Sequence, residues 1–354
     1  SELTALLENS GQETLPFIPA FPEMQRTTTN GVHYIEGDRL SESVFSQDPF
    51  EPTRESSIPK IIEMQSDIPT KVVSVGDKIP ECHTKTILIF DTETVEDLEN
   101  IVGELNDKTG LSIMAGCAGF AARLPKILNL NIGNKPKYDM AKNMFVANGS
   151  VNPVTVSQLD YAEKNGFTRI YLSQVQMLEK GYWNSKKGIK DMQELQSEFS
   201  KSKFCIVDTS DPQGLRETAK YAADHCISNE QLRNYIPSSL AKVISTKLDQ
   251  GQGTALMIMG GDTLMGFLKE LNVTDVYPVQ ELMPGTVLSR FKYRSKNYQV
   301  ISKSGGFGKM TLLLDLAKII ITSDKWEQIC SAGGNENVDT VFAADAQSYI
   351  WWRQ

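Results

Sequence analysis

Two glycine turns near the C-terminal end of the chain constrain the fold most. The first comprises residues 260–263, between a buried strand predicted over 255–259 and a helix predicted over 264–271. The second comprises residues 303–308 and also lies between a predicted strand and a predicted, mostly buried helix. Strands that pass through such turns into helices, repeated along a chain, are typical of α/β proteins.

The same two turns are candidate sites for phosphate groups. The first turn of a helix has backbone N–H groups without intrahelical partners and a partial positive charge, so anions bind there. Glycine lets phosphate oxygens approach the backbone closely. A single glycine turn is more often structural than functional, but two in the same context favour a ligand. The candidate residues are Gly260, Gly261, Asp262, Thr263, Lys303, Gly305 and Gly306.

Neither turn matches the common nucleotide motifs. Gly308 and Lys309 are followed by Met310, where a Walker A loop has Ser or Thr, and no glycine stands five residues before Gly308. Neither turn supplies G-x-G-x-x-G. A nucleotide would therefore bind these turns through a different arrangement.

The whole chain predicts an α/β fold of two domains with mainly parallel sheets flanked by helices. Its 354 residues and 40% hydrophobic content favour about two domains. Residues 1–85 are rich in proline and look incomplete as a domain, whereas strands and helices alternate from Thr86 onward. A polar stretch around residues 134–137 reads as a linker. We therefore expect domains over 1–138 and 143–322, and a tail of unknown role over 323–354.

Four acidic residues surround the junction between a strand predicted over 86–90 and the helix after it: Asp91, Glu93, Glu96 and Asp97. They allow an interpretation as a metal site or as acid–base catalysts. The structural interpretation is favoured, because Thr94-x-x-Asp97 forms a capping box and acids in a first turn complement the helix dipole.

Charge and composition narrow the class of partner. A net charge of −8 and a sequence pI of about 5.2 argue against a nucleic-acid surface, so small molecules are the expected ligands. No apolar run approaches the ~18 residues that span a bilayer, and the N-terminus has no signal segment, so we expect a cytoplasmic protein with no membrane partner. Five widely spaced cysteines and three histidines form no metal-binding pattern.

The order of several short motifs resembles the four-carbon acid sugar kinase family, whose members phosphorylate tetronates with ATP. Segments similar to the family's substrate-binding domain are residues 19–22 with Arg26, 31–34, 43–49, 91–98 and 115–120. Segments similar to its nucleotide-binding domain are residues 149–158, 260–263, 284–285 and 303–308. The resemblance covers most of the chain, and its pieces are colinear.

The resemblance implies that Ser150, the turn at 260–263 and Gly305 contact ATP. Ser150 lies between a predicted strand and a predicted helix, which suits a phosphate or ribose contact, although helix capping would also explain it. Asp262 either holds water around a Mg²⁺ ion bound to the phosphates or caps the helix after the turn.

Three basic residues are candidates to bind the anionic groups of the nucleotide or of the substrate. Lys303 and Lys309 are candidates to neutralise phosphate charge, and Lys303 ranks higher because it lies in the signature turn. Arg26 is the candidate for a substrate carboxylate, because a guanidinium matches a carboxylate with two hydrogen bonds. The alternative for Arg26 is a surface arginine in a loop.

The chain departs from the family pattern because it begins partway through the substrate-binding domain. The family's acidic Ala-Asp-Asp motif, which the resemblance associates with the general base, has no counterpart here, so the catalytic base stays unassigned. We expect a kinase that uses ATP and Mg²⁺ on a hydroxyl of a small sugar acid, preferably D-threonate or D-erythronate, with 3-oxo-tetronate as an alternative.

Two other functions are kept open. One is a nucleotide-binding protein without catalytic activity, for which a complementary N-terminal chain or a homodimer would be the protein partner. The other is an α/β protein whose glycine turns bind a sugar phosphate or nothing. Saturable ATP binding without sugar-phosphate binding would count against the last.

Overall fold

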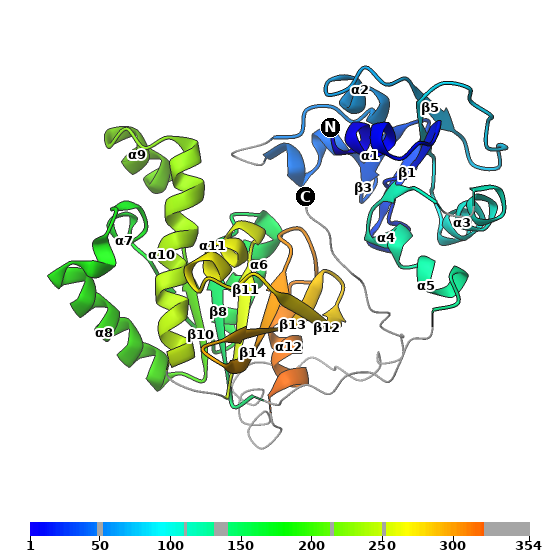
Figure 1. Cartoon of the computed structure of the whole chain (residues 1–354). Coiled ribbons are helices and arrows are strands. Elements are labelled where there is room, and N and C mark those ends of the chain that lie inside the picture. Colours follow the sequence, from blue (N-terminus) through cyan, green and yellow to red (C-terminus); the bar gives the residue numbers. More distant parts are fainter. Residues whose placement is uncertain (48–51, 110–111, 131–140, 213–215, 250–252, 322–354) are drawn as a thin grey trace. The chain divides into compact units, whose positions relative to one another are not determined.

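The computed structural model describes the chain except residues 48–51, 110–111, 131–140, 213–215, 250–252 and 322–354 (Figure 1). The chain divides into two compact units between Asn134 and Lys135. The predicted linker and the tail over 323–354 lie outside the described residues, so the domain boundaries at 138 and 143 stay a prediction.

The first unit is built on a four-stranded parallel sheet in the order β5-β6-β1-β7. The strands are β1 (Thr14–Ile18), β5 (Thr70–Val73), β6 (Thr86–Phe90) and β7 (Ala115–Gly116). The helices are α1 (Glu2–Asn9), α2 (Ile58–Glu63), α3 (Val95–Thr109), α4 (Ala118–Ala121) and α5 (Leu124–Ile127). Side chains of β6 alternate between two buried clusters, one with α3 and one with α1 and α2.

A small antiparallel sheet accompanies it, made of β2 (Arg26–Thr29), β3 (Val32–Ile35) and β4 (Asp38–Arg39). Three short 3₁₀ helices lie beside it: η1 (Pro22–Met24), η2 (Leu40–Glu42) and η3 (Val44–Gln47). Residues 1–85, which the sequence describes only as rich in proline and incomplete as a domain, therefore contain regular helices and strands. The sequence did not predict β1, because it contains Pro16 and proline is usually found in edge strands or turns. Strand β1 nevertheless lies inside the sheet.

The second unit contains a seven-stranded sheet in the order β12-β13-β14-β11-β8-β10-β9. The strands are β8 (Asn143–Asn148), β9 (Thr168–Tyr171), β10 (Phe204–Asp208), β11 (Thr254–Met259), β12 (Val276–Met283), β13 (Thr286–Tyr293) and β14 (Lys296–Lys303). The helices are α6 (Pro153–Lys164), α7 (Gln174–Leu178), α8 (Lys186–Lys201), α9 (Arg216–Asp224), α10 (Asn229–Asp249), α11 (Gly261–Glu270), α12 (Leu312–Ile320) and the 3₁₀ helix η4 (Tyr182–Asn184).

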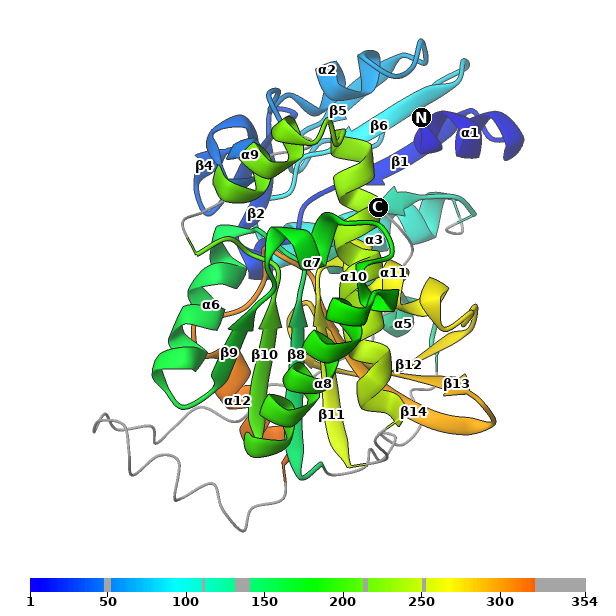
Figure 2. The same cartoon turned by 90° about the vertical axis from the view of Figure 1, so that its left-hand side faces the viewer.

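Helices cover both faces of this sheet. Met144 and Val146 of β8 pack with α6 and α12, whereas Phe145 between them stacks edge-on against Phe199 of α8. Figure 2 shows α8 and α10 in front of the strands and α12 behind them. Strands buried on both faces read as continuous apolar runs, which is why the strand predicted over 255–259 agrees closely with β11. The α/β class with mainly parallel sheets is confirmed.

Of the three antiparallel strands of this sheet, the sequence predicted only β14. Strands β12 and β13 were not predicted. Strands β12, β13 and β14 form a meander through two two-residue turns. Arg294 and Ser295 turn with positive φ between β13 and β14, although neither is a residue that normally signals such a turn. Pro284 and Gly285, noted as a family motif, form the turn between β12 and β13.

Candidate functional site

Both glycine turns and the loop after β8 meet at the carboxyl edge of the second sheet. A Cβ on Gly149 would lie 1.9 Å from Thr263 Oγ1, and one on Gly260 would lie 3.5 Å from the Ser150 nitrogen. A Cβ on Gly305 would lie 3.2 Å from Ser150 Oγ. The strands β8, β11 and β14 are adjacent and parallel, so their C-terminal loops are neighbours in space although they are far apart in sequence.

The first glycine turn opens α11. Gly260 is the N-cap residue, has φ 109°, and donates its N–H to the Lys303 carbonyl at 3.2 Å. Gly261 is exposed, and a Cβ placed on it would meet nothing within 4 Å. Asp262 is exposed in the first turn, and no side chain caps this helix. The N-terminus of α11 therefore presents backbone donors at an open position.

Ser150 does not cap α6. That role falls to Asn152, whose Oδ1 accepts from the Val154 N–H at 3.0 Å. The Ser150 hydroxyl accepts from the Asn152 N–H at 3.3 Å, and its own N–H donates to Asn148 Oδ1 at 3.1 Å. The capping explanation for Ser150 is thus wrong, because the helix starts two residues later than that explanation requires.

A buried polar network holds the loop that carries Ser150. The Asn148 amide donates to the Ser150 carbonyl at 3.0 Å and to Asp208 Oδ1 at 2.8 Å. The Asp208 carboxylate also accepts from the Ser210 N–H at 2.8 Å and pairs with Arg169 at 2.7 Å. Burial by itself would lower the pKa of the Arg169 guanidinium, but Asp160 and Asp208 together outweigh it and raise the pKa, so the charge persists at any working pH. Because every member has a partner, the network fixes the loop instead of leaving a buried charge unsatisfied.

The second glycine turn is held from inside the protein. Lys303 ends β14 and is only 2% exposed. Its amine donates to Thr155 Oγ1 at 3.0 Å and to the Gly305 carbonyl at 2.9 Å, and the Thr155 hydroxyl donates to the same carbonyl at 2.9 Å. Burial lowers the pKa of Lys303 from 10.5 to about 7.

The end of the same turn is clamped by Gln158 of α6. Its side-chain amide nitrogen lies 2.9–3.0 Å from the carbonyls of Phe307, Gly308 and Lys309. Phe307 in turn packs on Gly285, where a Cβ would lie 2.5 Å from its ring. The clamp therefore ties the turn to α6 on one side and to the β12–β13 hairpin on the other.

Arg26 belongs to the first unit. It begins β2, and its guanidinium lies over the Phe45 ring at 5.4 Å from the ring centre. Burial is the main cause that lowers its pKa. Arg26 is therefore a half-buried arginine that packs on an aromatic ring, and the loop-arginine alternative is wrong because it lies in a paired strand.

Two of the four acids at residues 91–97, Asp91 and Asp97, have structural partners. Asp91 is buried and accepts from the N–H groups of Asn30 and Gly31 at 2.9 and 2.8 Å, which fixes the β2–β3 turn. Asp97 and Thr94 exchange side-chain-to-backbone hydrogen bonds at 2.8 and 3.1 Å. The predicted capping box is confirmed.

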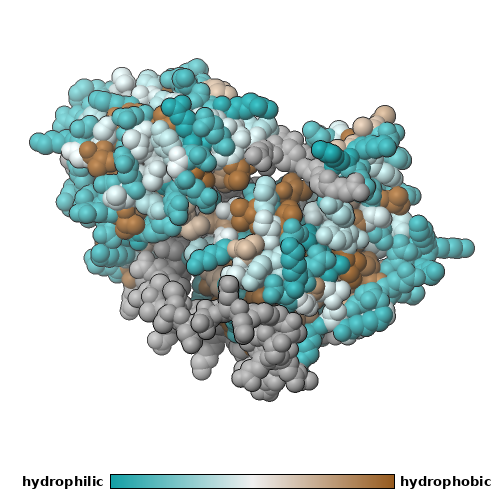
Figure 3. Space-filling view, turned by 180° about the vertical axis from the view of Figure 1, so that it is seen from behind, coloured by the Kyte–Doolittle hydropathy of each residue, from teal (hydrophilic) through white to brown (hydrophobic). Residues whose placement is uncertain are grey.

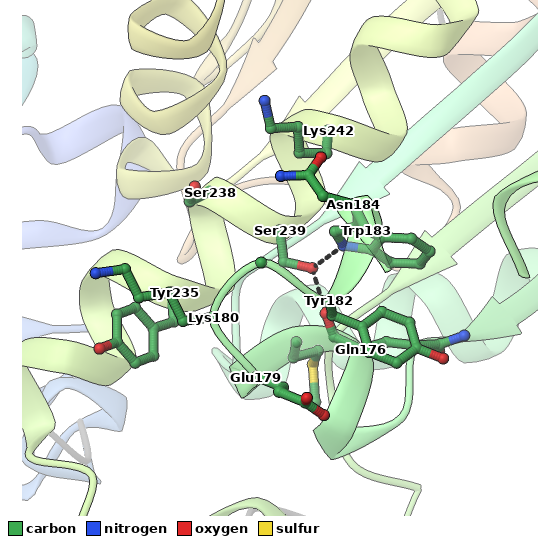
Figure 4. A pocket seen from close by; sticks show the side chains of 12 residues that line it. Gln176, Glu179, Lys180, Tyr182, Trp183, Asn184, Tyr235, Ser238, Ser239 and Lys242 are labelled. Carbon is green, nitrogen blue, oxygen red and sulfur yellow. Dashed lines mark hydrogen bonds between the residues drawn. The ribbon is translucent and has the colours of Figure 1, made fainter. Parts of the chain in front are cut away.

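A separate small pocket of about 110 Å³ lies between α7, η4 and α10 (Figure 4). Its central polar groups satisfy one another, since Trp183 donates to Ser239 at 2.7 Å and Ser239 donates to the Gln176 carbonyl at 2.7 Å. Neither glycine turn contributes a residue to its lining.

Figure 3 shows one face of the molecule, on which hydrophilic residues predominate over the parts that are described. In these parts, no helix is both long enough and apolar enough to cross a bilayer.

The residues at the carboxyl edge fit an oligophosphate. A cradle that a single methyl group at Gly149 or Gly260 would crowd, a helix N-terminus and the half-buried turn at Gly305 together offer backbone donors at close range. The sequence analysis named most of these residues but missed Asn148 and Asp208. Their signal is a polar residue at the end of each of two apolar strands, which are paired side by side.

Comparison with known domains assigns the two units to two different domain families. Residues 1–124 match the sugar-binding N-terminal domain, and residues 145–313 match the nucleotide-binding C-terminal domain. The candidate cradle lies inside the second match, and Arg26 lies inside the first.

Similar proteins include two named kinases. The chain is 23% identical over 336 residues to a D-threonate kinase of Salmonella typhimurium, covering 89% of this chain and 76% of that protein. It is 25% identical over 324 residues to a 3-oxo-tetronate kinase of Haemophilus influenzae, covering 86% and 73%.

Solved structures show the same fold. A Haemophilus influenzae protein superposes with a TM-score of 0.59 at 20% identity, covering 90% of this chain and 77% of the other. A Salmonella typhimurium protein described as a putative tRNA synthase gives a TM-score of 0.67 at 18% identity, covering 90% and 76%. The two domain matches and the named relatives show that the chain belongs to the four-carbon acid sugar kinase family.

Proposed function

We propose that this protein transfers the γ-phosphoryl group of ATP to a hydroxyl of a four-carbon sugar acid, with D-threonate or D-erythronate preferred and 3-oxo-tetronate as the alternative acceptor. Membership of a kinase family supports the reaction class. The preference for D-threonate or D-erythronate rests on residues 302–308, which resemble the tetronate branch of the family more than its 3-oxo-tetronate branch. A cytoplasmic location and a homodimer stay predictions.

The observation that carries the proposal is the convergence of Ser150, the turn at 260–263 and Gly305 at one sheet edge. Phosphoryl transfer depends mainly on positioning and on stabilising charge. Backbone N–H groups and the α11 dipole meet the second requirement without a large side-chain reorganisation. The exposed Asp262 carboxylate is the candidate to hold water around a Mg²⁺ ion on the phosphates.

The proposed acceptor site lies in the first unit. Arg26 supplies a guanidinium that is partly withdrawn from water, which strengthens its attraction for a carboxylate. The stacking on Phe45 limits the orientations of that guanidinium. We propose that Arg26 binds the acid group of the substrate.

Calorimetric titration of the whole chain with ATP and Mg²⁺ tests the nucleotide site. Gly261→Val is the most selective variant. Its new Cβ lies within 4 Å of no other group of the protein, so the fold is not disturbed, but the side chain occupies the position proposed for phosphate. We expect saturable binding by the wild type and a loss of at least about tenfold in affinity in the variant. Gly103→Val is the matched control, since Gly103 also lies in a helix with nothing within 4 Å.

A kinase assay on D-threonate, D-erythronate and 3-oxo-tetronate then tests the reaction. Turnover that falls in Arg26→Met, with ATP affinity unchanged, is the expected result for a carboxylate-binding arginine. If ATP binds and none of the three acids is phosphorylated, the nucleotide-binding protein without catalytic activity becomes the better description. If ATP does not bind, the proposed function fails.

A further inference from the structure

The Lys303 amine is unusual because it is buried with neutral partners. The structure places Met259 of β11 and Thr286 of β13 beside Lys303 in the sheet, and Thr155 of α6 at its amine. All three are uncharged. The side chain is 2% exposed, yet among the described residues no carboxylate pairs with it.

The partners of Lys303 fix the direction of one peptide group. The amine and the Thr155 hydroxyl both donate to the Gly305 carbonyl, so that carbonyl points toward the protein interior. In a planar trans peptide the C=O and the following N–H point in opposite directions. The Gly306 N–H is therefore turned away from Lys303, and within the described part of the chain it donates to no acceptor.

From this geometry we infer that Lys303 is a positioning residue of the nucleotide site: it orients the Gly305–Gly306 peptide toward the phosphates and takes up one proton from solvent when the nucleotide binds. The inference rests on the proposed function, because it requires the turn to face an oligophosphate. The proton comes from a buffer acid in solution, whose bond to hydrogen breaks, and a new N–H bond forms with the lone pair of Nζ.

The proton uptake follows from charge and burial. Burial is the one cause that lowers the pKa of Lys303 to about 7. The titratable groups on surrounding segments are Glu281, which accepts from the Gly285 N–H, the exposed Lys309, and Asp262 in α11. None of these contributes to that shift. A bound polyanion above the turn would favour the ammonium form and raise the pKa again.

The test is calorimetric titration of the whole chain with ATP and Mg²⁺ at pH 8, repeated in buffers of different ionisation enthalpy. The dependence of the measured heat on the buffer gives the number of protons taken up. We expect about half a proton or more for the wild type, and affinity that weakens as pH rises from 7 to 9. Lys303→Met should show almost no uptake, a flat pH profile and an affinity lower by about tenfold.

A second pair of variants separates positioning from folding. Thr155→Val removes one donor to the Gly305 carbonyl and should weaken ATP binding, whereas Thr155→Ser keeps the hydroxyl and should restore it. Wild-type binding without proton uptake, together with wild-type affinity in Thr155→Val, would overturn the inference and leave the proposed function standing. Absence of ATP binding by the wild type would instead overturn the proposed function. Should Lys303→Met fail to fold, the wild-type uptake and the Thr155 pair still decide.

Discussion

At the scale of single residues, His33 shows how burial, helped by a nearby positive charge, sets a charge state. Its imidazole is 7% exposed, and its Nδ1 lies 3.0 Å from Thr28 Oγ1. Burial, and secondarily the nearby Arg26, lower the pKa of His33 from 6.5 to about 4. The native protein therefore holds this histidine neutral, while an unfolded chain would protonate it below pH 6.5.

This difference predicts a pH dependence of stability. The contribution of neutral His33 is complete above pH 6.5 and is lost progressively as pH falls to about 4, because the unfolded chain then binds a proton that the folded chain excludes. We expect a loss of up to about 3 kcal/mol over this window in the wild type. His33→Gln should reduce the slope. Urea unfolding at pH 4 to 7 measures both, and parallel curves for the two proteins would contradict the assignment.

The contact between Gly149 and Thr263 predicts a strong coupling. Gly149→Ala places a methyl group 1.9 Å from Thr263 Oγ1, so overpacking should cost about 1–3 kcal/mol. Thr263→Ala removes that oxygen, and the double variant should be less destabilised than the sum of the single variants by about 1 kcal/mol or more. Chemical denaturation of the four proteins gives the coupling energy. Additive effects would show that the two residues do not touch.

At the scale of elements, the β12–β13 hairpin supports the second glycine turn. Gly285 has φ 70°, donates its N–H to Glu281 at 2.9 Å, and accepts from the Ser304 N–H at 3.1 Å. The ring of Phe307 fills the space where a Cβ would lie. The hairpin thus packs against the turn and supports it. At position 285, only glycine allows both the positive φ and the close contact with Phe307.

Gly285→Ala should therefore be destabilising by about 2–4 kcal/mol, from backbone strain together with the clash. The matched control is Gly181→Ala, because Gly181 has φ 78° but nothing within 4 Å of a Cβ. That control should cost only about 1 kcal/mol. The urea unfolding midpoints of the two variants separate the cost of backbone strain from the cost of the clash. Equal losses of stability in the two variants would mean that Phe307 moves aside without cost.

At the scale of the whole molecule, each unit has a hydrophobic core of its own. We expect two calorimetric unfolding transitions. A ligand that binds one native unit stabilises that unit, by about 2.7 kcal/mol at 100 times its dissociation constant. ATP with Mg²⁺ should therefore raise one transition and leave the other unchanged, and Gly261→Val should abolish the shift. A single transition, or equal shifts in both, would contradict this expectation.

Local sequence signals predicted most of the second unit but less of the first. The apolar runs of β6, β8, β10 and β11 identify buried strands because both faces of each sheet are covered. Strand β1 was missed because Pro16 contradicted it, and the β13–β14 turn was missed because Arg294 and Ser295 adopt positive φ without a typical sequence signal.

The sequence alone determined the α/β class, the positions of both glycine turns and the membership of a kinase family, because these depend on local periodicity and on motifs that are contiguous in the chain. The tertiary structure decided that Asn152 and not Ser150 caps α6, and that Asp208 supports the Ser150 loop. It also decided that Lys303 lies beneath its turn with a buried amine. These are consequences of the order in which distant strands pair, and that order brings residues together that no local pattern connects.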